Sequence, residues 1–318
     1  MNIPISSVVH KITILLLSLL SLLCLSAQSI AKVHKENTPG NAEKSWSFPF
    51  RGGYVHQFDV DLDEGGSFSV NRFFIQGGPT YSPARRRSIS FAVGYGYADY
   101  DFSSQRVLSN DSPWDDIHSF RFSLPVRWGI DNNWTFIAIP ALHFTGENGT
   151  DWNKAITGGG FAGFSYRFND RLTIGPGIGI ISQMEDSTSV FPILLISWKI
   201  IDRLSLNTGS GLAASQGPGL TLNWESSDQW ELHVGGRYEK LRFRLDKDGP
   251  APEGIGEDTS FPLIIGATYH YNRNTRMSLI AGVELGGKLR LEDKYGRLLT
   301  KDNHDPAGFL GITFYSRL

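Results

Sequence analysis

Large apolar residues and small or polar residues alternate strictly between Ser88 and Tyr97. Successive side chains of a β-strand point to opposite faces, so one face of this segment carries only bulk. Such a segment suits a strand that stands between lipid and a crowded or wet interior. The bulky residues are Ile89, Phe91, Val93, Tyr95 and Tyr97, and the small or polar ones are Ser88, Ser90, Ala92, Gly94 and Gly96.

The same alternation recurs along the rest of the chain, in segments bounded by turn residues. Counted this way, it predicts an all-β fold: a transmembrane antiparallel up-and-down β-barrel over residues 51–318, with about 14 strands and 12 as the main alternative. The predicted strand centres lie near Phe58, Phe73, Val93, Leu124, Ile139, Phe161, Gly177, Leu194, Leu206, Leu222, Val234, Ile265, Val283 and Ile312.

Short turns and longer connections alternate between these segments. Outer-membrane barrels have short periplasmic turns and longer outer loops, so this alternation returns both ends of the barrel to the periplasm. The short turns are Asp131 to Asn133, Asn169 to Arg171, Asp202 to Arg203, Ser227 to Gln229 and Asn272 to Asn274, and the long loops include Asp101 to Asp116, Gly146 to Lys154, Asp246 to Asp258 and Glu292 to Pro306.

Aromatic residues gather within a few positions of the short turns. Trp and Tyr favour the membrane interface, where the ring is partly buried and its polar atom stays wet. A soluble β-sandwich, the competing interpretation, gives no reason for Trp to collect at one end of its hairpins. The predicted membrane-interface girdle consists of Trp128, Trp134, Tyr166, Trp198, Trp224, Trp230, Tyr269 and Tyr271.

The N-terminus predicts export. Lys11 precedes a Leu-rich run from Ile12 to Leu25, and small residues follow, so residues 1–31 form a predicted signal peptide cleaved near Ala27 or Ala31. An uncleaved anchor helix is the alternative, although the run is short for a span. Residues 32–50 are polar and unpatterned and are predicted to be a flexible periplasmic tail. The single cysteine, Cys24, lies inside the apolar run, so the mature protein contains none.

Composition excludes a polytopic helical membrane protein but permits a barrel. The 318 residues carry a formal charge of -2, and the mean hydropathy is -0.19. In a barrel about half of each strand faces the lumen and can be polar, so the average stays low although the lipid face is apolar.

The final segment, Gly308 to Leu318, places Leu310, Ile312, Phe314 and Leu318 on one face. Here the sequence resembles bacterial outer-membrane β-barrel proteins, whose last strand is read by the barrel assembly machinery. With the short-turn repeats and the segment from Phe120 to Trp128, it looks like a family of predicted barrels of unassigned function. The resemblance lies in pattern, over roughly residues 50 to 318, and the terminal Leu318 stands where such proteins usually have an aromatic residue. It implies outer-membrane location and contact with outer-membrane lipid, and it gives no information about an activity.

The same parity assigns charged residues to the lumen, where they either select a solute by charge or pair with one another. Both interpretations remain open, because the predicted lumen contains both signs. The lumen-facing candidates are Arg121, Arg127, Glu231, His233, Arg237, Glu284, Lys288 and Arg290.

The alternation shifts by one position after Tyr238. Leu241, Phe243 and Leu245 continue the apolar set on the opposite parity. A β-bulge near Glu239 and Lys240 is predicted to return them to the lipid side.

Other chemistry is not indicated. A lipase-like pair is considered at His118 and Ser119, but adjacent strand residues point to opposite faces, so no enzyme is predicted. The histidines have no ligand-like spacing, and the loop from Asp246 to Glu257 departs from a calcium loop at Pro250 and Ala251, so no metal or cofactor is expected. Apart from Arg85 to Arg87 the sequence has no basic tract, so nucleic-acid binding is not indicated.

Two functions remain. The inward glycines and the mixed lumenal charge favour a porin-like barrel for passive passage of a small solute. The alternative is a closed structural or surface-binding barrel that acts through its outer loops.

Overall fold

The computed structural model describes residues 44–103, 112–185, 187–208 and 219–318. The predicted signal peptide lies outside these residues, as does the predicted tail up to residue 43. Residues 45–47 and 49–50, also assigned to the tail, are already strand, so the barrel begins earlier than predicted. The described residues contain one short 3-10 helix, η1 (Trp152–Lys154), and none of their helices is long and apolar enough to span a membrane.

Twenty strands form one sheet. In chain order they are β1 (Ser45–Ser47), β2 (Pro49–Asp61), β3 (Ser67–Gly77), β4 (Thr80–Ala84), β5 (Arg87–Ser90), β6 (Ala92–Ser103), β7 (Asp116–Ser123), β8 (Val126–Gly129), β9 (Trp134–Glu147), β10 (Ile156–Arg167), β11 (Leu172–Ser182), β12 (Thr188–Ile201), β13 (Leu204–Thr208), β14 (Gly219–Glu225), β15 (Trp230–Arg237), β16 (Glu239–Arg244), β17 (Ile255–His270), β18 (Thr275–Glu292), β19 (Leu298–His304) and β20 (Ala307–Arg317).

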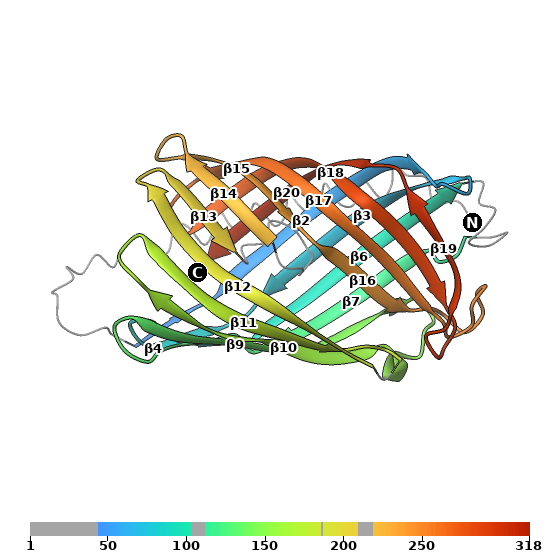
Figure 1. Ribbon diagram of the computed structural model, residues 1–318, viewed down its shortest axis with the longest axis horizontal. Coiled ribbons are helices and arrows are strands. Elements are labelled where there is room, and N and C mark those ends of the chain that lie inside the picture. The colour runs from blue at the N-terminus through green and yellow to red at the C-terminus, as the bar shows by residue number, and fades with distance from the viewer. Residues whose placement is uncertain (1–43, 104–111, 186, 209–218) are drawn as a thin grey trace. The chain divides into compact units, whose positions relative to one another are not determined.

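These strands make a closed antiparallel barrel of 14 wall strands, which confirms the predicted fold and strand number. Six wall strands are interrupted once, so that each consists of two consecutive strands: β1–β2, β3–β4, β5–β6, β7–β8, β15–β16 and β19–β20. Both halves of such a wall strand pair with the same neighbouring wall strand on at least one side. Consecutive wall strands pair around the barrel, and β2 pairs with β20 from Pro49–Arg317 to Gln57–Phe309, which closes it. Figure 1 shows these strands tilted around a common axis.

Side-chain oxygens build the short turns. Asp131 Oδ1 accepts hydrogen bonds from the backbone N–H groups of Asn133 and Trp134, both at 2.7 Å. Asn169 and Asn272 accept equivalent pairs in two other turns. Asp and Asn favour such turns because the side chain reaches the backbone two residues on. The repeated device explains why these hairpins are so tight.

The outward face is apolar over most of the barrel. Val93, Leu194 and Ile265 are 39%, 55% and 60% exposed, respectively. Around this band the register places large side chains side by side across neighbouring strands, such as Trp134 opposite Tyr166 and Trp230 opposite Tyr269. The assignment of bulky residues to the outer face therefore holds for the middle of the wall.

Candidate functional site

The outer half of the barrel interior is filled by a dry apolar core. Phe68, Val70, Ile117 and Leu289, from strands on different sides of the barrel, are at most 1% exposed. Trp114, which precedes β7 in a segment predicted as an outer loop, packs among them, and its ring lies 5.1 Å from that of Phe243. The remaining members are Val60, Leu62, Ala98, Tyr100, Leu245, Ala251, Leu291 and Ala307.

Strand β16 supplies part of this core, contrary to the predicted bulge. Gly236 pairs with Leu263 and Glu239 with Ser260, so the register against β17 continues unchanged across Tyr238. Phe243 and Leu245 therefore keep the inward parity and are 0% and 2% exposed. The shift in the alternation does not mark a bulge. It marks the point at which the inner face changes from a polar surface to an apolar core.

The end of β16 crosses the barrel mouth to β9. Arg244 pairs in parallel with Gly146, although several wall strands separate β16 from β9. The backbone approaches so closely that a Cβ on Gly146 would lie 3.1 Å from the Arg244 carbonyl oxygen. Thr150 Oγ1 donates to the Leu245 carbonyl oxygen at 3.0 Å. The mouth is thus closed by β16 and residues 245–254, here called the mouth segment.

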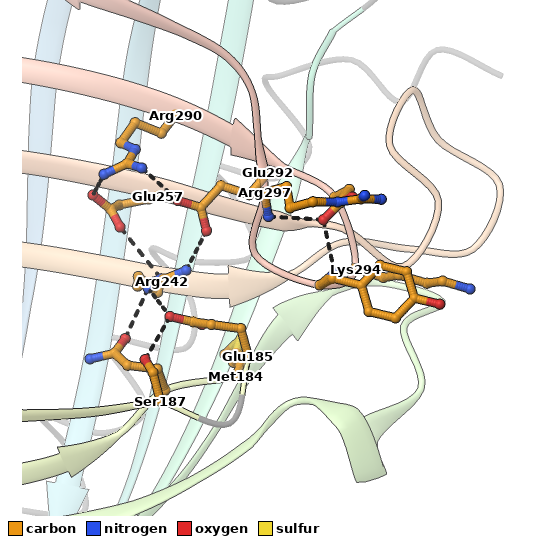
Figure 2. A network of polar contacts seen from close by, with 12 residues as sticks. Met184, Glu185, Ser187, Arg242, Glu257, Arg290, Glu292, Lys294 and Arg297 are labelled. Atoms are coloured by element: carbon orange, nitrogen blue, oxygen red, sulfur yellow. Dashed lines mark hydrogen bonds and ion pairs between the residues drawn. The ribbon is translucent and has the colours of Figure 1, made fainter.

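Ion pairs fix the other face of β16 (Figure 2). Arg242 Nη1 donates to Glu185 Oε1 at 2.9 Å, and Nη2 donates to a carboxylate oxygen of Glu292. Arg242 Nε also lies 3.4 Å from Glu257 Oε2. Arg290 Nη2 pairs with Glu292 Oε1 at 2.9 Å. Arg242 therefore joins β16 to the connection between β11 and β12 and to the end of β18.

The loops around the mouth contribute further bonds. Arg244 donates to the carbonyl oxygens of Met184 at 2.8 Å and Glu253 at 2.9 Å. Lys154 Nζ lies 2.7 Å from Glu253 Oε1, and this lysine lowers the pKa of the Glu253 carboxyl. Asp246 Oδ1 accepts from the backbone N–H groups of Asp248 and Gly249, so this aspartate caps a turn.

A second polar cluster bridges the lumen beneath the apolar core. Arg72 on β3 donates to Asp258 on β17 at 3.0 Å and to Glu284 on β18 at 2.9 Å. Tyr100 on β6 donates to the same Asp258 oxygen at 2.7 Å. An unpaired charge in this surrounding would be costly, which accounts for the close pairing. Gln57 on β2 is also fully buried, and its side-chain amide has no hydrogen-bond partner among the described residues.

The half of the barrel interior next to the short turns, which is predicted to be the periplasmic half, is lined by polar side chains. A cleft of about 330 Å³ lies between β11, β12 and β13 and is lined by Arg171, Ser197, Lys199, Asn207 and Glu225, among others. Arg171 and Lys199 both pair with Asp202, at 3.4 and 3.6 Å, on exposed side chains.

The structure brings only some of the predicted lumenal residues together. The register places Arg121 opposite His143 on the inner face. Arg127 is exposed at the periplasmic end. Glu231 is half-buried. His233 is 4% exposed and its ring nitrogens have no partner among the described residues.

Arg237 pairs with Glu239, and Glu284 with Arg72.

Lys288 and Arg290 face outward, which corrects their predicted position. Gly286 adopts φ +60, and the pairing of β17 with β18 shifts between Phe261–Leu285 and Thr259–Lys288. This bulge reverses the parity of β18, so the alternating Leu289 and Leu291 enter the core. Glycine meets the positive φ without steric cost.

The predicted aromatic girdle lies along the end with the short turns. Most of its members are exposed, including Trp128, Trp198 and Trp224 at 38%, 42% and 51%. Four of them form two contacting pairs, Trp134 with Tyr166 and Trp230 with Tyr269, with ring centroids 5.0 and 5.1 Å apart. Tyr271, in a turn, is the most exposed of them at 75%.

His118 and Ser119 lie on opposite faces of β7. His118 faces outward and is hydrogen-bonded to the Tyr95 hydroxyl at 2.8 Å and to the Asp116 carboxylate at 3.2 Å. No group of three or more His, Cys, Asp or Glu side chains within the described part of the chain is arranged to hold a metal ion.

Sequence reasoning missed the inner core and its anchor, Arg242. The signal was present in two places: the apolar set at Leu241, Phe243 and Leu245, and a tryptophan, Trp114, inside a predicted polar loop. Both signals are apolar residues at positions that a water-filled lumen would line with polar side chains.

Together, the closed sheet, the outward apolar band and the inner polar and apolar layers define a transmembrane β-barrel of the bacterial outer-membrane class. Residues 83–315 match the model of a family described as domain of unknown function (DUF6268), and the chain belongs to that family. No curated protein matches.

Several solved barrels are similar in fold. The COG4313 outer membrane channel from Pseudomonas putida F1 is 8% identical, with a TM-score of 0.47 over 89% of this chain and 100% of that one. A FadL homologue from Pseudomonas aeruginosa is 12% identical, with a TM-score of 0.43 over 86% and 89% of the two chains. The KdgM porin in complex with oligogalacturonate is 8% identical, with a TM-score of 0.32 over 83% and 97%.

Proposed function

We propose that this protein is a channel-like barrel of the outer membrane, through which a small polar solute passes passively when the mouth segment moves. The supporting observation is how that segment is held. Among the described residues, β16 pairs along β17 on one edge but meets β9 at a single position. The remaining attachments are side-chain ion pairs, single hydrogen bonds and the packing of Phe243 and Leu245 in the apolar core. None of these belongs to the backbone hydrogen-bond ladder of the wall.

The polar periplasmic half supports the same proposal. Its cleft offers both signs of charge on exposed side chains, so a polar solute can enter that far without losing its hydration. Passage then requires that the outer closure and the Arg72 cluster beneath it open. Charge and size would select the solute in such a lumen.

We also propose the route by which the protein reaches the membrane. Residues 1–31 act as a signal peptide, the mature chain enters the outer membrane of a Gram-negative cell, and the assembly machinery recognises β20. The outward apolar face of β20, with Leu310 and Ile312 at 52% and 41% exposure, supports recognition by a hydrophobic partner.

Conductance across planar bilayers tests the channel. The wild-type barrel is expected to open rarely, and Arg242→Gln to raise the open probability at least tenfold. Each charged hydrogen bond contributes roughly 1.5–3 kcal/mol, and about 1.4 kcal/mol changes an equilibrium tenfold. Arg297→Gln, which removes an ion pair with Asp293 on an exposed side chain in the connection between β18 and β19, is the matched control and is expected to leave opening unchanged.

A covalent bridge keeps the test decisive if Arg242→Gln folds poorly. Thr150→Cys with Leu245→Cys, joined by a short bis-maleimide, ties the mouth segment to the connection that follows β9 and is expected to abolish opening. If the wild type and Arg242→Gln are both correctly folded and neither conducts at any potential, the channel proposal is wrong.

The second candidate is a closed barrel that acts through its outer loops, and the dry core favours it. The buried members of that core are at most 7% exposed, as expected of a permanent plug. This candidate predicts no conductance from any folded variant. It also predicts that changes confined to residues 246–253 abolish partner binding.

A further inference from the structure

Two rows of side chains follow the outward parity of β16, β17, β18 and β19 at their outer ends, and at the β16 end Arg242 and Glu257 are covered by the connection between β11 and β12. The first row is Lys240, Thr259, Lys288 and Asn303, and the second is Arg242, Glu257, Arg290 and Lys301. Members of a row sit on neighbouring strands, about 4.8 Å apart. Lys240, Lys288, Arg290 and Lys301 are called the basic patch below.

The basic patch has more positive charge than its surroundings neutralise. Glu257 is already surrounded by Lys240 at 3.0 Å, Arg242 at 3.4 Å and Arg290 at 3.8 Å. Glu292 is shared by Arg242 and Arg290. Lys288 and Lys301 make no ion pair within the described residues, and Lys301 is exposed. Two ammonium groups therefore remain free to meet an anion.

The height of the patch on the barrel selects the source of that anion. Directly below it the outward positions are apolar, with Phe261 and Leu263 at 45% and 42% exposure. Twelve residues of β17 separate Glu257 from Tyr269 in the girdle, a rise of about 30 Å for a strand tilted by roughly 40°. That is about the thickness of the hydrocarbon layer, so the basic patch lies at the level of the outer headgroups.

Acidic side chains lie on another described part of the outer rim. On the outward face of β2, β6 and β7 the polar residues include Asp61, Asp99 and Asp116. The unpaired basic side chains thus lie on a different sector from these aspartates, and Lys154, which follows β9, is already paired with Glu253. A uniform solvated rim would not need this separation.

We infer that the basic patch binds the phosphate groups of a phosphorylated glycolipid in the outer leaflet. Its acyl chains lie against the apolar face of β17 and β18, and Lys288 and Lys301 contact its phosphates. This rests on the proposed outer-membrane location but not on solute passage. It gives the wall between β16 and β19 a fixed lipid neighbour.

Native mass spectrometry of the purified barrel tests this. The probe is a bis-phosphorylated acylated glucosamine disaccharide, compared with the same glycolipid without phosphate. The wild type is expected to bind the phosphorylated form more tightly. Lys288→Gln combined with Lys301→Gln is expected to weaken that binding about tenfold to thirtyfold, since each basic residue near a membrane surface contributes about 1 kcal/mol.

Arg273→Gln combined with Arg317→Gln removes the same charge at the other end of the barrel and is expected to leave binding unchanged. Equal binding of the two glycolipids, or no effect of the Lys288 and Lys301 substitutions, would overturn the inference. Inorganic phosphate that displaces the glycolipid at a concentration near the phosphate's own dissociation constant would also overturn it. The basic patch would then be a site for a soluble anion. Conductance of the same variants is measured separately, so glycolipid binding can be established even if the barrel does not conduct.

Discussion

The two halves of the barrel interior are built on opposite principles. In the outer half, apolar side chains from β2, β3, β6, β7, β16, β18 and β20 meet in a core in which Phe68 and Phe243 have no exposed surface. In the periplasmic half, the wall strands carry Ser197, Asn207 and Glu225 around a cleft open to water. The lipid face is similar in both. The contrast shows that the same alternating strand can enclose either a core or a lumen.

Charges serve different purposes at the two ends. At the periplasmic end a carboxylate such as Asp131 organises its own turn. At the outer end charges such as Arg242 join segments far apart in the chain. Turn charges fix local geometry, whereas charges at the mouth determine whether the two sides of the barrel stay together.

Truncating the core tests the contrast most strongly. Phe243→Ala is expected to lower the free energy of unfolding by about 3–5 kcal/mol, because a fully buried ring leaves a cavity. Leu195→Ala, on the inner face of β12 in the open half, is expected to cost much less. Urea unfolding of both variants in lipid vesicles measures the difference. Equal losses would mean that the outer half is not a packed core.

A charge on the lipid face tests the feature that the halves share. Val93→Arg is expected to impair assembly by roughly 2–4 kcal/mol if the residue lies near the bilayer midplane. Ala92→Ser, its neighbour on the inner face, is expected to have a mild effect. Folding yield into vesicles compares them. Similar damage from both substitutions would contradict the assignment of faces.

Acidification sharpens the comparison at the turn. Backbone N–H groups of Trp134 and Asn133 lower the pKa of Asp131 in the folded barrel. Its contribution to stability is therefore present above the unfolded pKa, about 3.9, and is lost as the pH falls through the folded pKa. Asp131→Asn is expected to lower the melting temperature slightly at pH 7, and this difference should vanish in strong acid.

Asn169→Asp is the reciprocal control for that turn, since Asn169 accepts the same two bonds without a charge. It is expected to raise the melting temperature slightly at pH 7. A difference for Asp131→Asn that grows on acidification would show that the carboxylate acts in another way.

Strand number, outward faces and turn positions could be predicted because each follows from local rules. Alternation, turn residues and the preference of Trp for an interface need no knowledge of distant contacts. The core could not be predicted in the same way. Phe243 has the same sequence signature whether a bulge turns it to lipid or the strand carries it inward, and only its pairing with Gly256 settles the choice.

Lys288 and Arg290 show the reverse failure. Their parity with Glu284 was correct in sequence, but a single extra residue at Gly286 turned them outward. A bulge of one residue leaves little trace in an alternating pattern when leucine and charged residues both continue beyond it. The anchor formed by Arg242 was equally hidden, because its partner Glu185 lies in the connection between β11 and β12 and its partner Glu292 at the end of β18.

The membership of the outer core constrains how the chain can assemble. Val60 and Leu62 come from the start of the barrel and Ala307 from its last wall strand, yet they pack in one cluster. The seam between β2 and β20 and the interior must therefore be completed together, with β16 already inside. A nascent chain stalled before its final strand would present this apolar surface unsealed, as a ready substrate for chaperones and proteases.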